Sequence, residues 1–378
     1  MREIFGTICL VGTIQTILLF FVLIVKRHNH NANRFLSLFM FFTALDAFEL
    51  YLGSRGYIIS ARPYQLSIIP YSFVFGPSVF FYSANLTARI HPFSKKYLLL
   101  YAPFAVLLAV NIIMLFKFEN SQLPQAVLYT NMIINGGGLF FEAILYAASL
   151  RMIQKYIGSL KDYFSAIDAL KLSLFRAALV VLILAVIFIF ISLFRGGHIR
   201  HEYKLLDVIA ILISLGLGFG IAFTAMIQPE LFTRIRLMEN AVPQDGPSSC
   251  PKYEKLRLPA SEEERYVRKM RGYMTEKKPY RREDLTLRDL ARELSLSTQH
   301  ISMILNIHFK QNFYNFINSY RVEEVKQKLI HPDYKNHNIL SIAYGAGFNS
   351  KSTFNTMFKK FTGKTPKEYR ADLSIEKN

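Results

Sequence analysis

Cysteine is scarce in this chain, with two residues in 378. Cys9 lies inside the first apolar run, and Cys250 lies in a polar stretch that contains several prolines. Disulfide frameworks need paired cysteines in one oxidising compartment. The sequence therefore excludes a small scaffold held together by disulfides.

The motifs of common enzyme classes are also missing. No P-loop is present, and the segment His201–Leu205 begins like a zinc-protease motif but lacks its second histidine. His198 and His201 share a helical spacing, but two histidines alone are a weak metal signal. We predict no catalytic residue, no metal site and no cofactor.

Acidic residues are in deficit, since 27 Asp and Glu oppose 45 Lys and Arg and leave a net charge of +18. In residues 1–227 the basic side chains lie in short stretches between apolar runs, where they can fix membrane topology. In residues 228–378 they are spread along polar helices, which suits a polyanionic partner. Without a motif, a merely soluble basic surface would be the better interpretation.

Long apolar runs fill the first part of the chain. A helix that spans a bilayer needs ~20 mainly apolar residues, and seven runs reach or approach that length. They cover approximately 4–25, 35–53, 66–87, 97–116, 126–150, 173–194 and 205–227. We therefore predict a seven-helix transmembrane domain over residues 1–230.

The charges between these runs predict the topology. With the N-terminus outside, the inner loops hold more basic residues than the outer loops, as the positive-inside rule requires. Seven crossings then leave the C-terminus in the cytoplasm. No basic region precedes the first run, whereas Lys26 and Arg27 follow it. We expect residues 4–25 to be a retained membrane helix and not a cleaved signal peptide.

Three carboxylates lie within the apolar runs, namely Asp46, Glu49 and Glu142. Ionisable groups at membrane depth are costly and by default face an interior or a cavity. We treat the three as a candidate sensor site for a ligand or a proton, and structural pairing with polar neighbours is the alternative. Gly136–Gly138 and Pro70 mark irregular helices that either line such a site or permit close packing.

Residues 231–260 are predicted to form a cytoplasmic linker, because the stretch from Glu239 to Ala260 is polar and contains several prolines. About 20 residues of flexible chain span ~25 Å, enough for a following domain to stand off the bilayer. Residues 261–276 then form a charged amphipathic helix. We expect this helix to pack on the domain that follows, and a dimer contact is the alternative.

Residues 286–307 carry the spacing of a helix-turn-helix. Thr286 is a good N-cap, apolar residues follow at helical intervals, and Ser297 caps a second helix after a brief turn. In this motif the N-terminal end of the second helix meets base edges in the major groove. The predicted DNA-reading residues are Thr298, Gln299, Ser302 and Met303.

A second copy of the pattern covers residues 338–361. Gly345 and Gly347 mark its turn region, and Ser350 caps its second helix. One face of that helix is rich in phenylalanine and the other is polar. The predicted base-reading residues are Lys351, Ser352, Asn355 and Thr356, and the predicted phosphate contacts are Lys359 and Lys360.

One long helix, from about Phe313 to Leu329, joins the two motifs and is capped by Asn312. Such a helix is a rod of ~26 Å, and successive major-groove faces lie ~34 Å apart. With the width of the flanking helices added, one chain can place both reading helices in adjacent grooves. Two helix-turn-helix patterns joined by one helix are a much stronger indication of DNA binding than a single pattern.

Residues 261–371 resemble the DNA-binding domain of AraC/XylS-family transcriptional regulators. The resemblance rests on Leu287–Ala291, Ile342–Ala343, Gly347–Ser350, Phe354–Lys360 and Thr362–Arg370. It implies base-reading roles for Gln299, Ser302, Met303, Lys351, Ser352 and Asn355. Met303 departs from the family, in which a polar or basic reader is common there. The apolar part, with Gly76-Pro77 before Phe80-Phe81-Tyr82, is similar to the multi-pass sensors of bacterial membrane-tethered members.

These features together predict an all-α protein, with a seven-helix transmembrane bundle followed by a cytoplasmic AraC-type domain over residues 261–378. The resemblance implies a transcription regulator, in most family members an activator, in the cytoplasmic membrane of a bacterium. The expected partners are double-stranded promoter DNA, the lipid bilayer, RNA polymerase, an unidentified small-molecule or protein signal, and a second copy of the chain. One alternative is a transporter or enzyme with an appended regulatory domain. Another is proteolytic release of the tail through residues 240–260.

Overall fold

The computed structural model describes residues 2–26, 30–56, 69–87, 98–117, 125–166, 172–194 and 259–375, with isolated positions between 212 and 222. Within these residues the regular elements are helices, apart from one antiparallel β-bridge between Phe164 and Thr286. The all-α prediction is confirmed for this part of the chain. The chain divides into a first unit, Met1–Gln154 with Leu174–Met238, and a second unit, Lys155–Ser173 with Glu239–Asn378.

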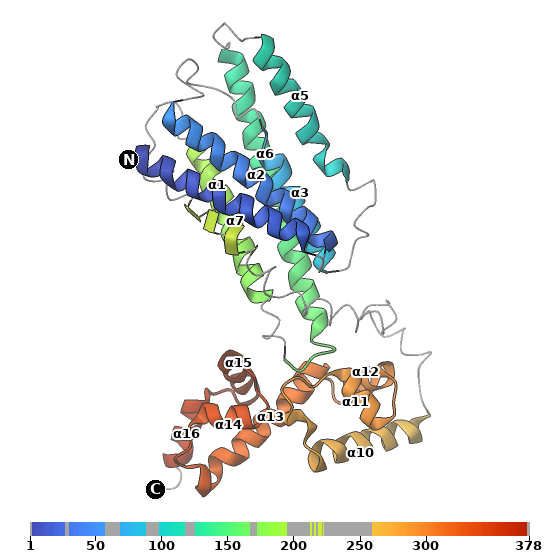
Figure 1. Ribbon diagram of the computed structural model, residues 1–378. Coiled ribbons are helices and arrows are strands. Elements are labelled where there is room, and N and C mark those ends of the chain that lie inside the picture. The colour runs from blue at the N-terminus through green and yellow to red at the C-terminus, as the bar shows by residue number, and fades with distance from the viewer. Residues whose placement is uncertain are drawn as a thin grey trace. The chain divides into compact units, whose positions relative to one another are not determined.

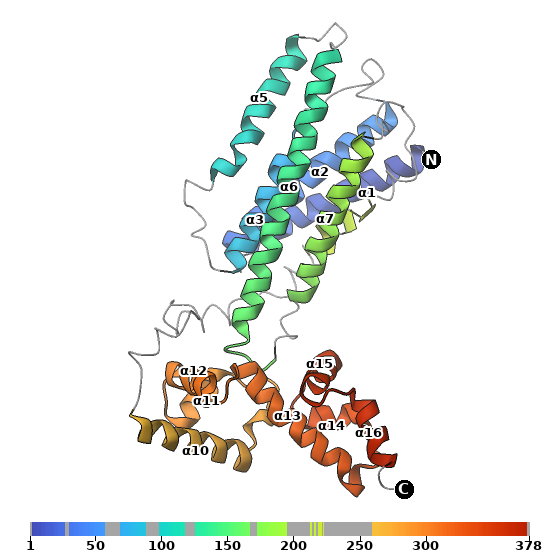
Figure 2. The same cartoon turned by 180° about the vertical axis from the view of Figure 1, so that it is seen from behind.

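The first unit is built from long apolar helices (Figure 1). The elements of this part of the chain are α1 (Arg2–Val25), α2 (His30–Arg55), α3 (Ser72–Leu86), η1 (Leu99–Tyr101), α5 (Ala102–Lys117), α6 (Gln125–Leu160) and α7 (Leu172–Phe194). Each of the first six predicted apolar runs overlaps one of these helices. α6 is one uninterrupted helix (Figure 2), and its residues from Lys155 onward belong to the second unit.

Three helices in the described residues are long and apolar enough to cross a membrane, namely Arg2–Val25, His30–Arg55 and Ile133–Leu160. Leu99–Met114 and Phe175–Phe190 are apolar but shorter. Three spans therefore replace the seven that the sequence predicts, as far as the described residues extend. Most of the seventh run, 205–227, lies outside them.

α3 illustrates why an apolar run need not be a full span. The predicted run covers 66–87, yet the helix begins only at Ser72, just after Pro70. Proline disfavours helical backbone at the residue before it and so limits how far the helix extends. The 15 residues of α3 extend ~22 Å, less than the ~30 Å of a bilayer core. Residues 66–68 of this run are not among the described residues.

α1 has a large apolar surface that none of the other described helices covers. Its residues Ile4, Val11 and Leu18 follow one another at intervals of seven and are 57–64% exposed. On another face Cys9 and Leu23 are fully buried. An exposed apolar stripe of this size is unfavourable in water. It is typical of a helix that faces lipid on one side and packs on protein on the other.

The second unit contains the helices of both predicted motifs. Its further elements are α10 (Ala260–Glu276), η6 (Pro279–Arg281), α11 (Leu287–Leu294), α12 (Thr298–Ile307), α13 (Phe313–Ile330), η7 (Pro332–Tyr334), α14 (Ile339–Gly345), α15 (Lys351–Thr362) and α16 (Pro366–Ile375). α11 and α12 form the first helix pair, and α14 and α15 form the second. α13 lies between the two groups of helices (Figure 1).

Side-chain caps fix where these helices begin. Thr286 and Asp289 form a capping box at the start of α11, in which each side chain accepts from the backbone N–H of the other residue. Ser297, Asn312 and Ser350 each accept a backbone N–H in the first turn of α12, α13 and α15. Each cap satisfies a donor that has no partner inside the helix. The four caps predicted at these positions are confirmed.

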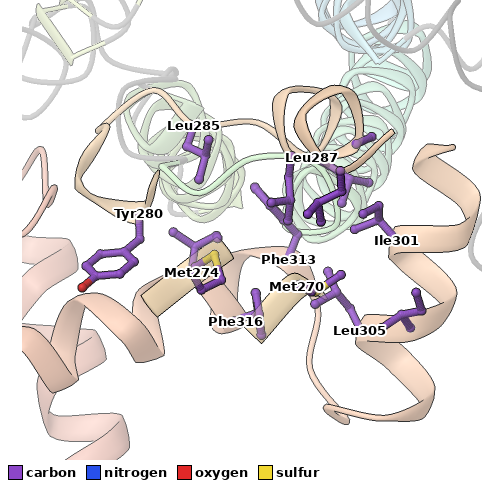
Figure 3. Close-up of a cluster of buried hydrophobic side chains, with 14 residues drawn as sticks. Met270, Met274, Tyr280, Leu285, Leu287, Ile301, Leu305, Phe313 and Phe316 are labelled. Atoms are coloured by element: carbon purple, nitrogen blue, oxygen red, sulfur yellow. The ribbon is translucent and has the colours of Figure 1, made fainter. Parts of the chain in front are cut away.

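Two hydrophobic cores lie on the two halves of α13. The first core joins α13 to α10, α11 and α12, and Figure 3 shows its side chains converging. The second core joins α13 to α14 and α15. α13 contributes Phe313, Phe316 and Ile317 to the first core and Val322, Val325 and Leu329 to the second. Each such side chain contributes roughly 1.5–3 kcal/mol when fully buried, so α13 fixes both helix pairs to one rod.

Candidate functional site

The polar face of α15 is the most complete surface in the candidate DNA-binding region. Lys351, Ser352, Asn355 and Thr356 are all exposed. Thr353, Phe354, Met357 and Phe358 alternate with them and are buried in the second core. The helix therefore presents one polar stripe, which begins at its capped N-terminal end. This is the end at which a reading helix meets base edges in the major groove.

The two lysines further along α15 differ in their surroundings. Both are exposed. Lys360 donates to Asn315 Oδ1 over 2.8 Å, and its ammonium lies 5.7 Å from the centre of the Phe361 ring. Lys360 is thus already held against α13 and its own helix. Lys359 is therefore the better placed of the two predicted phosphate contacts.

The N-terminal end of α12 matches the predicted reading surface only in part. Thr298, Gln299 and Ser302 are partly exposed, and the Thr298 hydroxyl lies 3.4 Å from Gln299 Oε1. Met303, which we expected on the exposed side, is fully buried at 0%. Its apolar side chain precedes Ile304 directly and widens the buried face of the helix. Met303 is therefore a packing residue in this structure, and it presents no surface to a base.

The length of α13 sets the separation of the two reading helices. Its 18 residues form a rod of ~27 Å. The pair α11–α12 packs at one end and the pair α14–α15 at the other. With the helix widths added, this separation suits adjacent major-groove faces, which lie ~34 Å apart.

A buried polar network on α13 holds the two helix pairs in register. Arg321 is 1% exposed and donates to Tyr280 O over 2.7 Å and to Arg282 O over 2.8 Å. Its guanidinium lies 5.9 Å from the centre of the Phe348 ring. Burial lowers the pKa of Arg321 to about 10, which still leaves the group charged at neutral pH. Arg321 thereby links η6 to the second helix pair.

Glu324 lies one turn further along α13 and completes this network. Arg281 Nη2 lies 2.8 Å and Lys328 Nζ 2.7 Å from Glu324 Oε1. The Glu324 side chain is 6% exposed. Sequence reasoning missed Arg321 and Glu324. Their signal is a pair of charged residues on the inward-facing positions of a helix otherwise lined by Phe, Ile and Val.

The three carboxylates predicted inside the apolar runs lie close together in the first unit. Tyr71 donates its hydroxyl to Glu49 Oε2 over 2.9 Å. Tyr146 donates to Glu142 Oε1 over 2.7 Å. Asp46 lies near enough to both carboxylates for their charges to interact. We call Asp46, Glu49 and Glu142 the acidic cluster.

The acidic cluster is assembled from α2, α6 and the residues that begin α3. Glu142 is 5% exposed, and Ser72 at the start of α3 is a second hydrogen-bond partner. Among the described residues, no group of His, Cys, Asp and Glu side chains has the arrangement of a metal site. Tyrosine and serine hydroxyls are hydrogen-bond partners of two of the three carboxylates, Glu49 and Glu142. Such a cluster can change its net charge by gaining or losing a proton.

Glycines bring α3 and α6 together beside the acidic cluster. A Cβ atom on Gly76 would lie 3.0 Å from the Cα of Glu142, and one on Gly138 would lie 2.8 Å from the Phe73 ring. Both contacts join α3 to α6. Gly138, one of the three glycines that the sequence marks as irregular, therefore permits close packing inside an unbroken helix.

Comparison with known proteins concerns the second unit. The family "Helix-turn-helix domain" matches residues 290–372. An uncharacterised HTH-type transcriptional regulator of Staphylococcus aureus strain COL is 37% identical over 90 residues, which cover 24% of this chain and 12% of that protein. The raffinose operon transcriptional regulatory protein RafR of Pediococcus pentosaceus is 29% identical over 90 residues, 24% of this chain and 31% of the relative. A solved structure of a protein of unknown function from Listeria innocua is 24% identical, covers 28% of this chain and 94% of that one, and has a TM-score of 0.25.

These similarities are confined to one part of the chain. The matched stretch spans 12% of the staphylococcal relative and 31% of the Pediococcus relative. The family match at residues 290–372 contains α12, α13, α14 and α15, and most of α11. The capped second helix of each motif therefore lies within it. Residues 290–372 are an AraC-type helix-turn-helix domain.

Proposed function

We propose that the chain is a membrane-embedded, sequence-specific DNA-binding transcription regulator, and in particular an activator. The observation that carries the proposal is the presence, on one chain, of an AraC-type helix-turn-helix domain and apolar helices long enough to cross a bilayer. The names of the relatives, which are transcriptional regulators, support the DNA-binding half of the proposal. The exposed polar stripe of α15 supplies its chemistry.

In this proposal residues 1–230 form the membrane part of the chain, which includes the three candidate spans, with the N-terminus outside. The protein then resides in the cytoplasmic membrane of a bacterium, with the helix-turn-helix domain in the cytoplasm. The lipid-facing stripe of α1 and the basic stretches between the apolar runs support this placement. Promoter DNA is the principal partner, and RNA polymerase and a second copy of the chain are further partners.

The acidic cluster is the proposed site at which the membrane half receives its signal. Asp46, Glu49 and Glu142 come from two helices, and tyrosine and serine hydroxyls hold two of the three carboxylates. A proton, a small cationic molecule or a membrane protein that approaches the cluster would alter its charge and hydrogen bonds. Either change would favour one packing of α2, α3 and α6 over another.

Promoter binding by full-length protein in lipid nanodiscs tests the DNA-reading role. The probe is a DNA fragment found by mapping the protein's bound sites across the genome. Lys351→Ala and Asn355→Ala should each weaken specific binding by roughly 5- to 150-fold, the effect of losing one good base contact. Lys367→Ala, in α16, is the matched control and should bind normally. Unchanged sequence preference in both α15 variants would refute the assigned reading surface.

A second measurement separates phosphate contacts from base contacts. Lys359→Ala should weaken binding to specific and unrelated DNA alike and reduce the salt dependence of the affinity by about one counterion. Asn355→Ala should leave that salt dependence unchanged. If Asn355→Ala reduced the salt dependence and Lys359→Ala left it unchanged, Asn355 would be the phosphate contact and Lys359 the base contact.

The sensor role is tested in cells that carry a reporter gene under a bound promoter. Glu142→Gln keeps the shape of the side chain but removes its charge. We expect a changed reporter level at unchanged protein level and unchanged DNA affinity in nanodiscs. Glu3→Gln, at the exposed start of α1, is the control. A Glu142→Gln variant with unaltered output would remove this residue from the proposed sensor site.

A further inference from the structure

The segment that directly follows α6, Lys161–Ala166, packs against the helix-turn-helix domain within the second unit. We call these residues the docking segment. In the sequence they belong to a predicted inner loop between two membrane spans, and their partner Leu285 lies 120 residues further along the chain. The matched domain at 290–372 does not include them.

The docking segment pairs with the residues that begin α11. Ser165 donates its backbone N–H to Leu285 O over 3.3 Å, and Leu287 donates to Tyr163 O over 3.0 Å. These bonds flank the antiparallel bridge between Phe164 and Thr286. Leu287 is the first residue of α11, and N–H groups in the first turn have no acceptor inside their own helix. The docking segment supplies that acceptor.

The docking segment also caps α13. Tyr314, the second residue of that helix, donates its N–H to Lys161 O over 2.9 Å. The Lys161 ammonium lies 6.0 Å from the centre of the Tyr314 ring. The ring of Tyr163 packs on the first hydrophobic core. One short segment therefore fixes the first helix of the first motif and the rod that joins both motifs.

Ser165 extends the contact into the buried network of α13. Its carbonyl oxygen accepts from Asn318 Nδ2 and from Arg321 Nη1, each over 3.2 Å, and its hydroxyl accepts from Arg321 Nη2 over 3.2 Å. The same hydroxyl donates to Leu285 O over 2.7 Å. Ser165 and Arg321 are each 1% exposed. A buried guanidinium is costly unless its donors are satisfied, so Arg321 favours a docked Ser165.

We propose that the docking segment is the contact through which α6 controls the DNA-binding domain. This inference rests on the proposed function and names the route by which the signal reaches the reading helices. The segment begins immediately after Leu160, the last residue of α6. A displacement or rotation at the end of α6 therefore acts on the capped ends of α11 and α13 with no intervening chain.

The alternative route is the linker at 231–260, and the two routes differ in stiffness. Within that linker the polar, proline-containing sequence from Glu239 to Ala260 predicts a loose tether, which would transmit little force or torque. A helix is a rigid element that can carry two discrete arrangements between sites. Glu142 of the acidic cluster lies on the same uninterrupted helix as Leu160. The candidate sensor and the docking segment are thus joined by helix alone.

A disulfide tests whether the segment is docked in the full-length protein. Phe164 and Thr286 form an antiparallel pair without direct hydrogen bonds, a geometry with Cα atoms ~4.5 Å apart, which a disulfide can bridge. The variant carries Phe164→Cys and Thr286→Cys in a Cys9→Ser, Cys250→Ser background. After mild oxidation in nanodiscs, we expect loss of both polyethylene-glycol maleimide additions on a gel, and their return after reduction.

The control pair for the disulfide is Phe164→Cys with Lys367→Cys, which lies on α16 in the other helix pair. This pair should keep both maleimide additions after the same oxidation. The single variant Thr286→Cys shows any effect of losing the α11 cap on DNA binding. Equal protection of both pairs, or protection of neither, would refute docking.

A matched pair of insertions tests which route carries the signal. One variant has Gly-Gly-Ser inserted between Leu160 and Lys161, which leaves the docking segment intact but detaches it from α6. The other has the same insertion between Asp245 and Gly246 in the linker. We expect the first to change reporter output by roughly fivefold or more, within the range of allosteric couplings, and the second to leave it unchanged. A change only in the linker variant would overturn the proposal.

The measurements separate failure of this inference from failure of the proposed function. DNA binding in nanodiscs without formation of the disulfide would leave a regulator that lacks the docking contact. Disulfide formation without any sequence-specific DNA binding would support the docking contact and refute the proposed function. Disulfide formation with reporter output insensitive to the insertion after Leu160 would reduce the docking segment to a structural cap and refute the control role.

Discussion

Gly347 lies where the second helix pair approaches the backbone of η6. Its φ of +97° is in the left-handed region, where residues with a Cβ are strained. A Cβ atom would overlap Tyr280 O and lie 2.8 Å from the carbonyl carbon of Arg281. These are backbone atoms, which cannot move aside as a flexible side chain can. Gly363 also has a positive φ, of +77°, but nothing lies within 4 Å of its Cβ position.

The two glycines form a matched pair of alanine variants. Gly363→Ala should destabilise the second unit by only ~1–2 kcal/mol, the conformational cost alone. Gly347→Ala carries the same cost plus a backbone clash, so it should destabilise by clearly more. The free energy of unfolding is measured by pulsed hydrogen exchange of α15 peptides in full-length protein across a urea series. If the two variants lost the same free energy of unfolding, the backbone of η6 could move away from the added Cβ atom at no energetic cost.

Met303 offers a test of packing against DNA reading at a single position. Met303→Leu conserves volume and should cost less than about 1.5 kcal/mol of stability, with sequence preference unchanged. Gln299→Ala, one turn earlier, should change preference at one base pair while leaving stability unaltered. Selection of bound sequences from a random DNA pool, performed with both variants, measures the preferences. A shifted preference with Met303→Leu would return this residue to the reading surface.

Sequence patterns give the caps and the polar face of α15 with little error, because both depend on local chemistry. A Ser or Thr directly before a helical run of apolar residues usually caps that helix. Thr286, Ser297 and Ser350 all do so. Met303 is harder to place, since its position on the helix allows either a buried or an exposed side chain. Ser165 gives no local signal, because its partners lie 120 to 156 residues away.

At the scale of elements, α13 combines an apolar rod with a buried ionic network. Burial of Glu324 disfavours its charge, but hydrogen bonds from Arg281 and Lys328 outweigh this effect and hold its pKa below the ordinary value of 4.5. A carboxylate whose pKa is lowered by folding stabilises the folded state above its unfolded pKa. That contribution is lost as the pH falls through the folded pKa.

Glu324→Gln should therefore destabilise the second unit most at neutral pH. We expect a loss of about 1–3 kcal/mol at pH 7, the cost of removing hydrogen bonds to a charged group. The gap between wild type and variant should narrow as the pH falls through the lowered folded-state pKa of Glu324, because the wild-type carboxylate then becomes protonated. Urea midpoints of α13 peptides at several pH values give the comparison. A gap that is constant with pH would mean that shape, and not charge, is what the network requires.

The elements differ in how far their sequence predicts them. α10 and α13 begin and end within one residue of prediction, and α11, α12 and α15 begin directly after their predicted caps. The apolar runs of the first unit coincide with helices, but run length does not measure helix length. Pro70 delays α3, whereas α6 continues past its apolar run to Leu160. The docking segment has neither periodicity nor length, so only its long-range partners reveal it.

At the scale of the whole molecule, the two units bury their side chains by opposite rules. The second unit buries most of its phenylalanines, among them Phe316, Phe348 and Phe358, and exposes lysines such as Lys351 and Lys359. The first unit exposes apolar residues on α1 and buries Glu142 and Ser149. The pattern of the second unit is typical of a protein surface in water, and the pattern of the first unit is typical of one in lipid. The contrast supports the proposed membrane location of the first unit, and the predicted topology follows from the loop charges.

The two cysteines of the chain provide a direct test of topology. Cys250 should react with a membrane-impermeant maleimide only after cells are made permeable, because the linker is predicted to be cytoplasmic. Gly197→Cys, in the predicted outer segment between the sixth and seventh runs, should react in intact cells. Cys9, which is fully buried in α1, should react in neither case, and Cys250→Ser provides the blank. Labelling of Cys250 in intact cells would invert the topology.

The position of the docking segment in the sequence has a consequence for how the protein is made. At translation rates of about 5–20 residues per second, Leu285 leaves the ribosome roughly 6–24 s after Ser165, from which it is separated by 120 residues. Arg321 follows later still, and in the proposed membrane protein it meets a Ser165 whose preceding helices are already inserted. A tail cut free within residues 240–260 would lack Ser165 altogether, and Arg321 would lose the two hydrogen bonds that it donates to that residue. In the proposed membrane protein, the DNA-binding domain is therefore complete only while it remains part of the chain that contains the membrane helices.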